Sequence, residues 1–273
     1  MKKIIYRFPF LSRILLAIIL GCIALMLGGF VYSVFPIRPW FPFAGEAFLL
    51  LFTLVLYRTE KHDLPPLGLR PSLKNIAYLF CGLVIAIAAL LGATWLRTLY
   101  SGEVWHLSPN IDMTAMAKSL YYVLPSVIVQ ELMFRGYLFT KTISRLGIVK
   151  TNIIFAVLFA LVHVVDRDVI QNPPKIIMLG ICTAVGHLWF ATALLRSKTI
   201  LFPIGLHLGN NWAVMHLAGM SDNNQSIFYL TDQKAYTTWM SFIILLLIFN
   251  VFFLLVTWLT WKSRWPFRAE NIA

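Results

Sequence analysis

The sequence predicts an all-α membrane protein, a polytopic bundle of about eight transmembrane helices forming one integral domain over residues 1–273. Hydrophobic residues make up 59% of the chain and charged residues only 12%. A soluble domain carries about 25% charged residues, so this composition excludes that class. The apolar residues also gather in runs near the roughly 20 residues that a helix needs to cross a bilayer.

The candidate spans follow one another along the whole chain. They cover residues 10–35, 43–57, 74–99, 113–140, 147–166, 174–195, 200–219 and 237–261. The second is short, and glycine and polar residues interrupt the seventh. The first follows a basic start but is longer than the apolar part of a signal peptide, so we expect it to be retained.

The basic residues predict the orientation of these spans. With the N-terminus in the cytoplasm, sixteen Lys and Arg fall on the cytoplasmic side and six on the other; with Arg135 inside a span, this accounts for all 23. The positive-inside rule therefore predicts an even number of spans with both N- and C-termini cytoplasmic. Basic loops that meet anionic head groups explain the net charge of +12, which does not indicate a nucleic-acid partner.

Ionisable residues interrupt the fourth span. Glu131 and Arg135 are four residues apart, so on a helix they share one face, directly after Gln130. Charged groups at membrane depth are costly and usually face a bundle interior or a water-filled cavity. Pro125 is expected to kink the helix toward such a cavity. A purely structural ion pair is the alternative.

Further polar groups lie in later spans. His163 is deep in the fifth, and His207 and Asn211 are four apart in the seventh. At about 1.5 Å per residue, Glu131 and His207 lie roughly 10–15 Å from the cytoplasmic ends of their spans and His163 about 20 Å. We expect the three to meet in one chamber open to the cytoplasm. A single membrane histidine more often packs, but this set on three spans indicates a buried reaction centre.

Such a set suits peptide hydrolysis. A carboxylate or histidine takes a proton from water, with or without a metal that lowers the pKa of that water. A second histidine and an amide donate hydrogen bonds to the oxyanion. The zinc motif HExxH and the serine motif GxSxG are absent. The remaining candidates are interpreted as packing, peripheral or loop residues: Cys22, Cys81, Cys182, His187, Asn210, His106, His216, Asp166, Arg167 and Asp168.

Together these motifs resemble the CPBP family of intramembrane proteases, which includes type II CAAX prenyl endopeptidases and bacterial bacteriocin-processing or immunity proteins of the Abi group. The family pattern is Glu-Glu-x-x-x-Arg, then Phe-x-x-x-His, then His-x-x-x-Asn. Here it reads Gln130 to Arg135, Phe159 to His163 and His207 to Asn211. The resemblance covers about residues 115–215 and includes the run from Leu194 to Ile204.

The resemblance implies a role for each matched position. Gln130 and His163 stand where the family activates water, and His207 and Asn211 stand where it stabilises the oxyanion. Glu131 and Arg135 would support the site. If Zn²⁺ or another divalent metal takes part, His163 and His207 are its candidate ligands. The implied partner is a peptide or protein substrate at the bilayer, and the implied location is a bacterial cytoplasmic membrane.

Gln130 departs from the family pattern, because a carboxamide has no useful basicity. Glu131 could act as the base instead, although it lies about 100° further round the helix. The chain could also be a silent member that binds a peptide or confers bacteriocin immunity, or Gln130 could be an isosteric replacement of a catalytic glutamate. A small-solute transporter is a less favoured class, because the paired interrupted segments of such folds are not evident.

Overall fold

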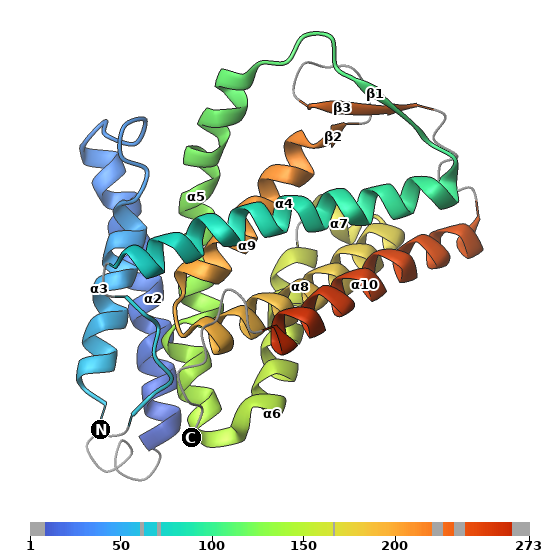
Figure 1. Cartoon of the computed structure of the whole chain (residues 1–273). Helices are drawn as coiled ribbons and strands as arrows, with labels where there is room; N and C mark the ends of the chain where they lie inside the picture. Colours follow the sequence, from blue (N-terminus) through green and yellow to red (C-terminus); the bar gives the residue numbers. More distant parts are fainter. Residues whose placement is uncertain are drawn as a thin grey trace. The chain divides into compact units, whose positions relative to one another are not determined.

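The computed structural model describes residues 9–60, 63–69, 72–165, 167–219, 226–231 and 238–263. These residues are mostly helical, as the sequence predicts (Figure 1). The helices are α2 (Pro9–Val34), α3 (Ala44–Arg58), α4 (Leu73–Ser101), α5 (Met113–Arg135), α6 (Tyr137–Val164), α7 (Arg167–Ile170), α8 (Pro173–Ser197), α9 (Leu201–His216) and α10 (Trp239–Lys262). Every predicted span therefore contains a helix.

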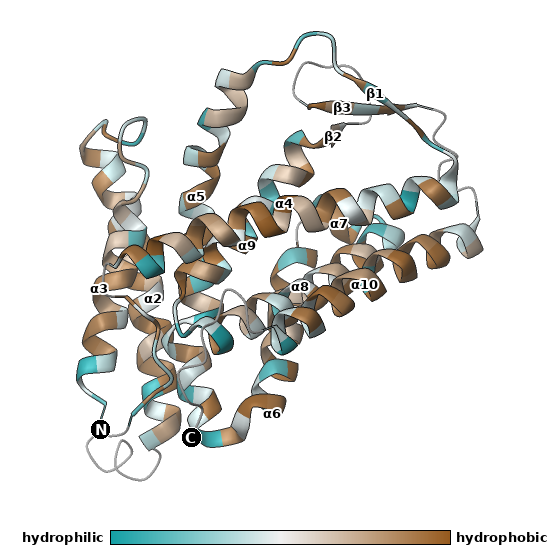
Figure 2. Ribbon diagram, viewed as in Figure 1, coloured by the Kyte–Doolittle hydropathy of each residue, from teal (hydrophilic) through white to brown (hydrophobic). Residues whose placement is uncertain are grey.

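Within the described residues, five helical segments are long and apolar enough to cross a membrane: Pro9–Val34, Leu73–Ser101, Met113–Val164, Pro173–Ser197 and Trp239–Lys262. The helices α3 and α9, with 15 and 16 residues, are shorter than a full span. Many large apolar residues of these helices are exposed. Figure 2 shows apolar residues along most of the helical ribbons. Such exposure is unfavourable in water and is expected where helices face lipid.

The number of spans and their orientation stay predictions. Of the basic residues counted on the two sides of the membrane for this prediction, several lie outside the described residues. These are Lys2, Lys3, Arg7, Lys61, Arg70, Lys234, Arg264 and Arg268.

The chain turns sharply where the fourth and fifth predicted spans meet. The fourth span was expected to reach residue 140, but α5 ends at Arg135 and α6 begins at Tyr137. Inside α6, Gly147 adopts φ 77° and ψ 169°, a backbone conformation that favours glycine, and it kinks the helix. The fifth predicted span thus corresponds to the part of α6 after this kink.

Contacts divide the chain into two compact units. The first unit comprises Met1–Leu67 and Leu124–Phe155, and the second comprises Gly68–Val123 and Ala156–Ala273. Both α5 and α6 run from one unit into the other. The prediction of a single integral-membrane domain stays a prediction.

In the first unit, Glu60 connects α2, α3 and α6. Its carboxylate follows α3 and accepts hydrogen bonds from Tyr137 and Lys141 of α6. The Nε atom of Arg13, on α2, lies 3.4 Å from Glu60 Oε1. Burial raises the pKa of the Glu60 carboxyl, but the hydrogen bonds from Lys141 and Tyr137 and the charges of Lys141 and Arg13 outweigh it. They hold this pKa below its ordinary value.

In the second unit, α4 and α9 pack backbone to backbone. A Cβ atom at Gly205 would lie 2.1 Å from the carbonyl oxygen of Leu79, and one at Gly209 would lie 2.3 Å from that of Leu83. Only glycine permits this approach, which is common where membrane helices associate. The glycines that interrupt the seventh predicted span therefore serve helix packing. They also fix the position of His207, which lies between them in the sequence.

A small sheet in the second unit was not predicted. It contains β1 (Val104–Leu107), β2 (Ala218–Gly219) and β3 (Phe228–Thr231) in the order β1-β3-β2. β1 pairs antiparallel with β3, placing Trp105 opposite Leu230, whereas β2 pairs parallel with β3. The strands lie in the segments that connect helices (Figure 1).

Candidate active site

The α5 motif lies in the first unit and contains a buried ion pair. Nη1 of Arg135 donates a hydrogen bond to Oε1 of Glu131 over 3.2 Å, and neither side chain is exposed. This contact confirms that the two residues share one helix face. Two charges without contact to water are stable only when they compensate each other well, so each side chain depends on its partner.

Gln130 precedes Glu131 and points about 100° away from it around the helix. Its side chain is half-buried. Its Oε1 atom is fully covered, and within the described residues no group donates a hydrogen bond to it. Gln130 and Glu131 therefore have different surroundings, although they are neighbours in the motif.

Three histidines in the second unit surround the ring of Phe159. The ring centre of His163 lies 4.5 Å from that of Phe159, and those of His187 and His207 lie at 6.2 and 6.1 Å. Phe159 is only 2% exposed. The three histidines come from α6, α8 and α9, so the fold brings side chains from three helices to one aromatic ring.

The backbone of α6 fixes the tautomer of His163. Nδ1 of His163 lies 2.7 Å from the carbonyl oxygen of Phe159. A carbonyl oxygen only accepts, so Nδ1 carries the proton and donates it. The lone pair is then on Nε2, which is the form of imidazole that accepts a proton. In the neutral ring, Nε2 of His163 is therefore the nitrogen that can accept a proton.

Contacts of its ring with α8 and of its helix with α4 fix the position of His207. Its ring stacks on Phe190 of α8 with centres 4.8 Å apart and planes at 19°. The side chain is 4% exposed, and its position on α9 is fixed by the close approach of that helix to α4. Asn211 lies one turn later on the same side of α9 and is half-buried.

His187 was interpreted as a packing residue from the sequence. The structure places it, fully buried, against the same ring as His163 and His207. Its only local sequence signal is an apolar helix with Gly186 beside it, which does not distinguish a site histidine from a packing one.

The other candidate residues differ from one another in burial and in contacts. His216, expected at the periphery, is buried, and its Nε2 lies 2.7 Å from Ser119 Oγ. His106 Nε2 lies 3.0 Å from Thr231 Oγ1 in the sheet. Arg167 and Asp168 are exposed, as expected, but they lie in the short helix α7 and not in a loop, whereas Asp166 lies outside the described residues. The prediction that Glu131, His163 and His207 meet in one chamber stays a prediction.

Within the part of the chain that the structure describes, no group of three or more His, Cys, Asp and Glu side chains is placed to hold a metal ion. His163, His187 and His207 all lie against Phe159, but among the described residues they do not form such a group. The prediction of His163 and His207 as candidate metal ligands stays a prediction.

The apolar helices and the polar residues buried among them define the class of this protein as integral membrane. A comparison with known protein families agrees with the motifs of the site. Residues 112–213 match the family model described as type II CAAX prenyl endopeptidase Rce1-like. This segment runs from the start of α5 through most of α9 and contains all three motifs, so the resemblance to CAAX-type proteases is confirmed.

The match supports a CAAX protease-type intramembrane peptidase acting on a peptide at the membrane. Neither a curated protein nor a solved structure matches the chain.

Proposed function

We propose that the protein is an intramembrane endopeptidase that hydrolyses a membrane-associated peptide by attack of water. The observation that carries this proposal is the histidine arrangement around Phe159. His163 has its Nδ1 proton committed to a backbone carbonyl, and His207 is locked beside the same ring. A general base with a fixed tautomer and a second rigid donor are what amide hydrolysis requires.

In the proposed reaction, Nε2 of His163 accepts a proton from water while the water oxygen bonds to the scissile carbonyl carbon. His207 and Asn211 donate hydrogen bonds to the carbonyl oxygen as it becomes negative. His163 then returns the proton to the leaving nitrogen, and the C–N bond breaks. The products are a carboxylic acid and an amine, which ionise to a carboxylate and an ammonium group.

The α5 motif has a different role in this proposal. Gln130 cannot take a proton, so the base function falls to His163. The amide of Gln130 can still orient water or a substrate through hydrogen bonds. The buried pair of Glu131 and Arg135 keeps the helix that carries Gln130 in its conformation.

A second candidate function is supported by Gln130 itself. A family member that has lost the acidic residue at this position can keep the remaining site for binding, as a silent peptide-binding or bacteriocin-immunity protein. The family resemblance supports the bacterial cytoplasmic membrane as the location, and the basic residues in the loops support a cytoplasmic position for both termini.

A peptide-release assay on the detergent-solubilised protein separates the two functions. Wild type is compared with Gln130→Glu and with Gln171→Glu, a matched change at an exposed turn residue. Cleavage by wild type supports the peptidase. Cleavage by Gln130→Glu alone identifies a protease site whose base is missing in this chain and contradicts His163 as a sufficient base. No cleavage by any variant across a broad peptide library favours the binding function.

A further inference from the structure

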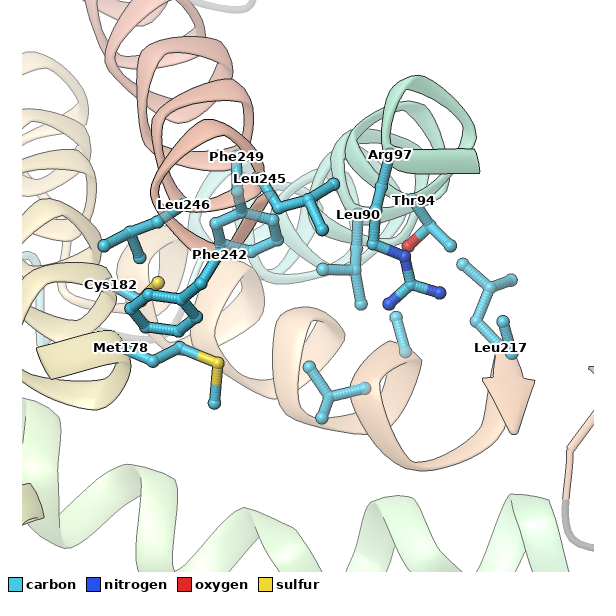
Figure 3. A pocket seen from close by; sticks show the side chains of 13 residues that line it. Leu90, Thr94, Arg97, Met178, Cys182, Leu217, Phe242, Leu245, Leu246 and Phe249 are labelled. Carbon is cyan, nitrogen blue, oxygen red and sulfur yellow. The ribbon is translucent and has the colours of Figure 1, made fainter. Parts of the chain in front are cut away.

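A partly enclosed cavity of about 280 Å³ lies within the second unit, apart from the three motifs. Side chains of α4, α8, α9 and α10 line it (Figure 3). Most of the lining is apolar, including Leu90, Met178, Phe242, Leu245 and Phe249. Ligand sites are typically apolar hollows with a few fixed polar groups, and this cavity has that character.

Arg97 is the one charged side chain among the described residues that line this cavity. It projects from α4, and Figure 3 shows its guanidinium group reaching into the space between the apolar side chains. Its Nε donates a hydrogen bond to Oε2 of Glu103 over 3.1 Å. Its two terminal nitrogens donate no hydrogen bond to another described residue. The fork of the guanidinium is thus available to an acceptor in the cavity.

Glu103 holds this guanidinium in place. Its carboxylate accepts hydrogen bonds from Arg97 Nε and, at 2.7 Å, from Ser101 Oγ, and its side chain is 8% exposed. The arginine is therefore oriented before any ligand arrives, which lowers the entropy cost of binding. Because Glu103 uses Nε, the two terminal nitrogens keep the geometry that suits bidentate binding of a phosphate.

The polar and apolar parts of the cavity follow the depth of a bilayer. Arg97 lies in the last turns of α4, a helix long enough to cross a membrane, about 6 Å from its end at Ser101. Cys182 and Phe249, which line the apolar part, lie near the middle of α8 and α10. The cavity therefore has a charged group at head-group depth and an apolar part at acyl-chain depth.

We propose that this cavity binds one acyl chain of an anionic membrane phospholipid, whose phosphate accepts hydrogen bonds from the terminal nitrogens of Arg97. Water is disfavoured in the apolar part of this cavity, and acyl chains are the apolar groups that a bilayer supplies. The positive guanidinium selects a lipid with a net negative head group over a zwitterionic one. The proposal is independent of the peptidase function.

Lipid retention in native mass spectrometry tests the head-group contact. The full chain is reconstituted with phosphatidylglycerol and phosphatidylcholine in equal amounts and then released from detergent. Wild type is expected to retain one phosphatidylglycerol molecule. Arg97→Gln is expected to retain it about tenfold to a hundredfold less, because a charge-assisted hydrogen bond is lost. The control Arg167→Gln removes an exposed arginine of the same unit and is expected to behave as wild type.

Occupancy of the apolar part is measured at Cys182, a free thiol in the lining. In a Cys22→Ala, Cys81→Ala background, phosphatidylglycerol is expected to slow modification of Cys182 by an apolar thiol reagent, whereas phosphatidylcholine is not. Leu246→Trp, which fills the cavity without changing charge, is expected to abolish specific retention. Equal retention of both lipids, unchanged retention in Arg97→Gln, or equal protection by both lipids would overturn the proposal.

Discussion

Nδ1 of His163 lies 2.7 Å from the carbonyl oxygen of Phe159, one helical turn earlier in α6. Because that oxygen can only accept, the contact determines which nitrogen of the imidazole carries the proton. The same residue, Phe159, also contacts His187 and His207 through its ring. Phe159 thus fixes the tautomer of the proposed base through its backbone carbonyl and contacts the proposed oxyanion donor through its ring.

The buried ion pair of α5 is expected to stabilise the fold. Glu131→Ala and Arg135→Ala should each lower the free energy of unfolding by about 3–5 kcal/mol, because each leaves an uncompensated buried charge. Glu131→Leu combined with Arg135→Met should cost less than either single change. Denaturant unfolding in detergent, followed by circular dichroism, measures all four proteins. Single variants as stable as wild type would show that the pair is not structural.

The Glu60 cluster predicts an acid-sensitive first unit. The folded-state pKa of Glu60 is lowered relative to its ordinary value, so its contribution to stability is present above the ordinary carboxyl pKa and is lost as the pH falls through the folded pKa. Unfolding midpoints measured between neutral pH and strongly acidic pH should fall more steeply for wild type than for Glu60→Gln. Parallel curves for the two proteins would contradict this role for Glu60.

Asn211 is expected to stabilise the oxyanion. Asn211→Leu keeps the size of the side chain but removes its donor, and it should lower kcat by about 100-fold to 1000-fold with a small effect on KM. The neighbouring variant Asn210→Leu is the matched control, because that side chain points about 100° away around α9. A loss of equal size in both variants would indicate a packing effect on α9 and no oxyanion contact.

Hydropathy was sufficient to predict the helices, because a bilayer permits few alternatives to a helix with satisfied backbone groups. The motif spacing likewise predicted the shared face of Glu131 and Arg135. A break between residues 140 and 147 was predicted as a loop, but the helix α6 continues across this segment and kinks at Gly147. The sheet that pairs Trp105 with Leu230 joins segments far apart in the chain, and its strands are too short to show a period. The position of His187 beside Phe159 was not predicted for a related reason, because only tertiary packing brings the two residues together.

The most direct test of the account is the peptide-release activity of His163→Ala with and without added imidazole. The variant should insert and fold as wild type does. Its activity should fall by about 100-fold to 10,000-fold, and part of that activity should return when free imidazole replaces the missing base. The variant His106→Ala, which removes a histidine of the sheet, should keep its activity. Full activity of His163→Ala would contradict the assignment of His163 as the base. Loss of activity that imidazole does not restore, with reduced folding yield, would instead indicate that His163 only packs against Phe159.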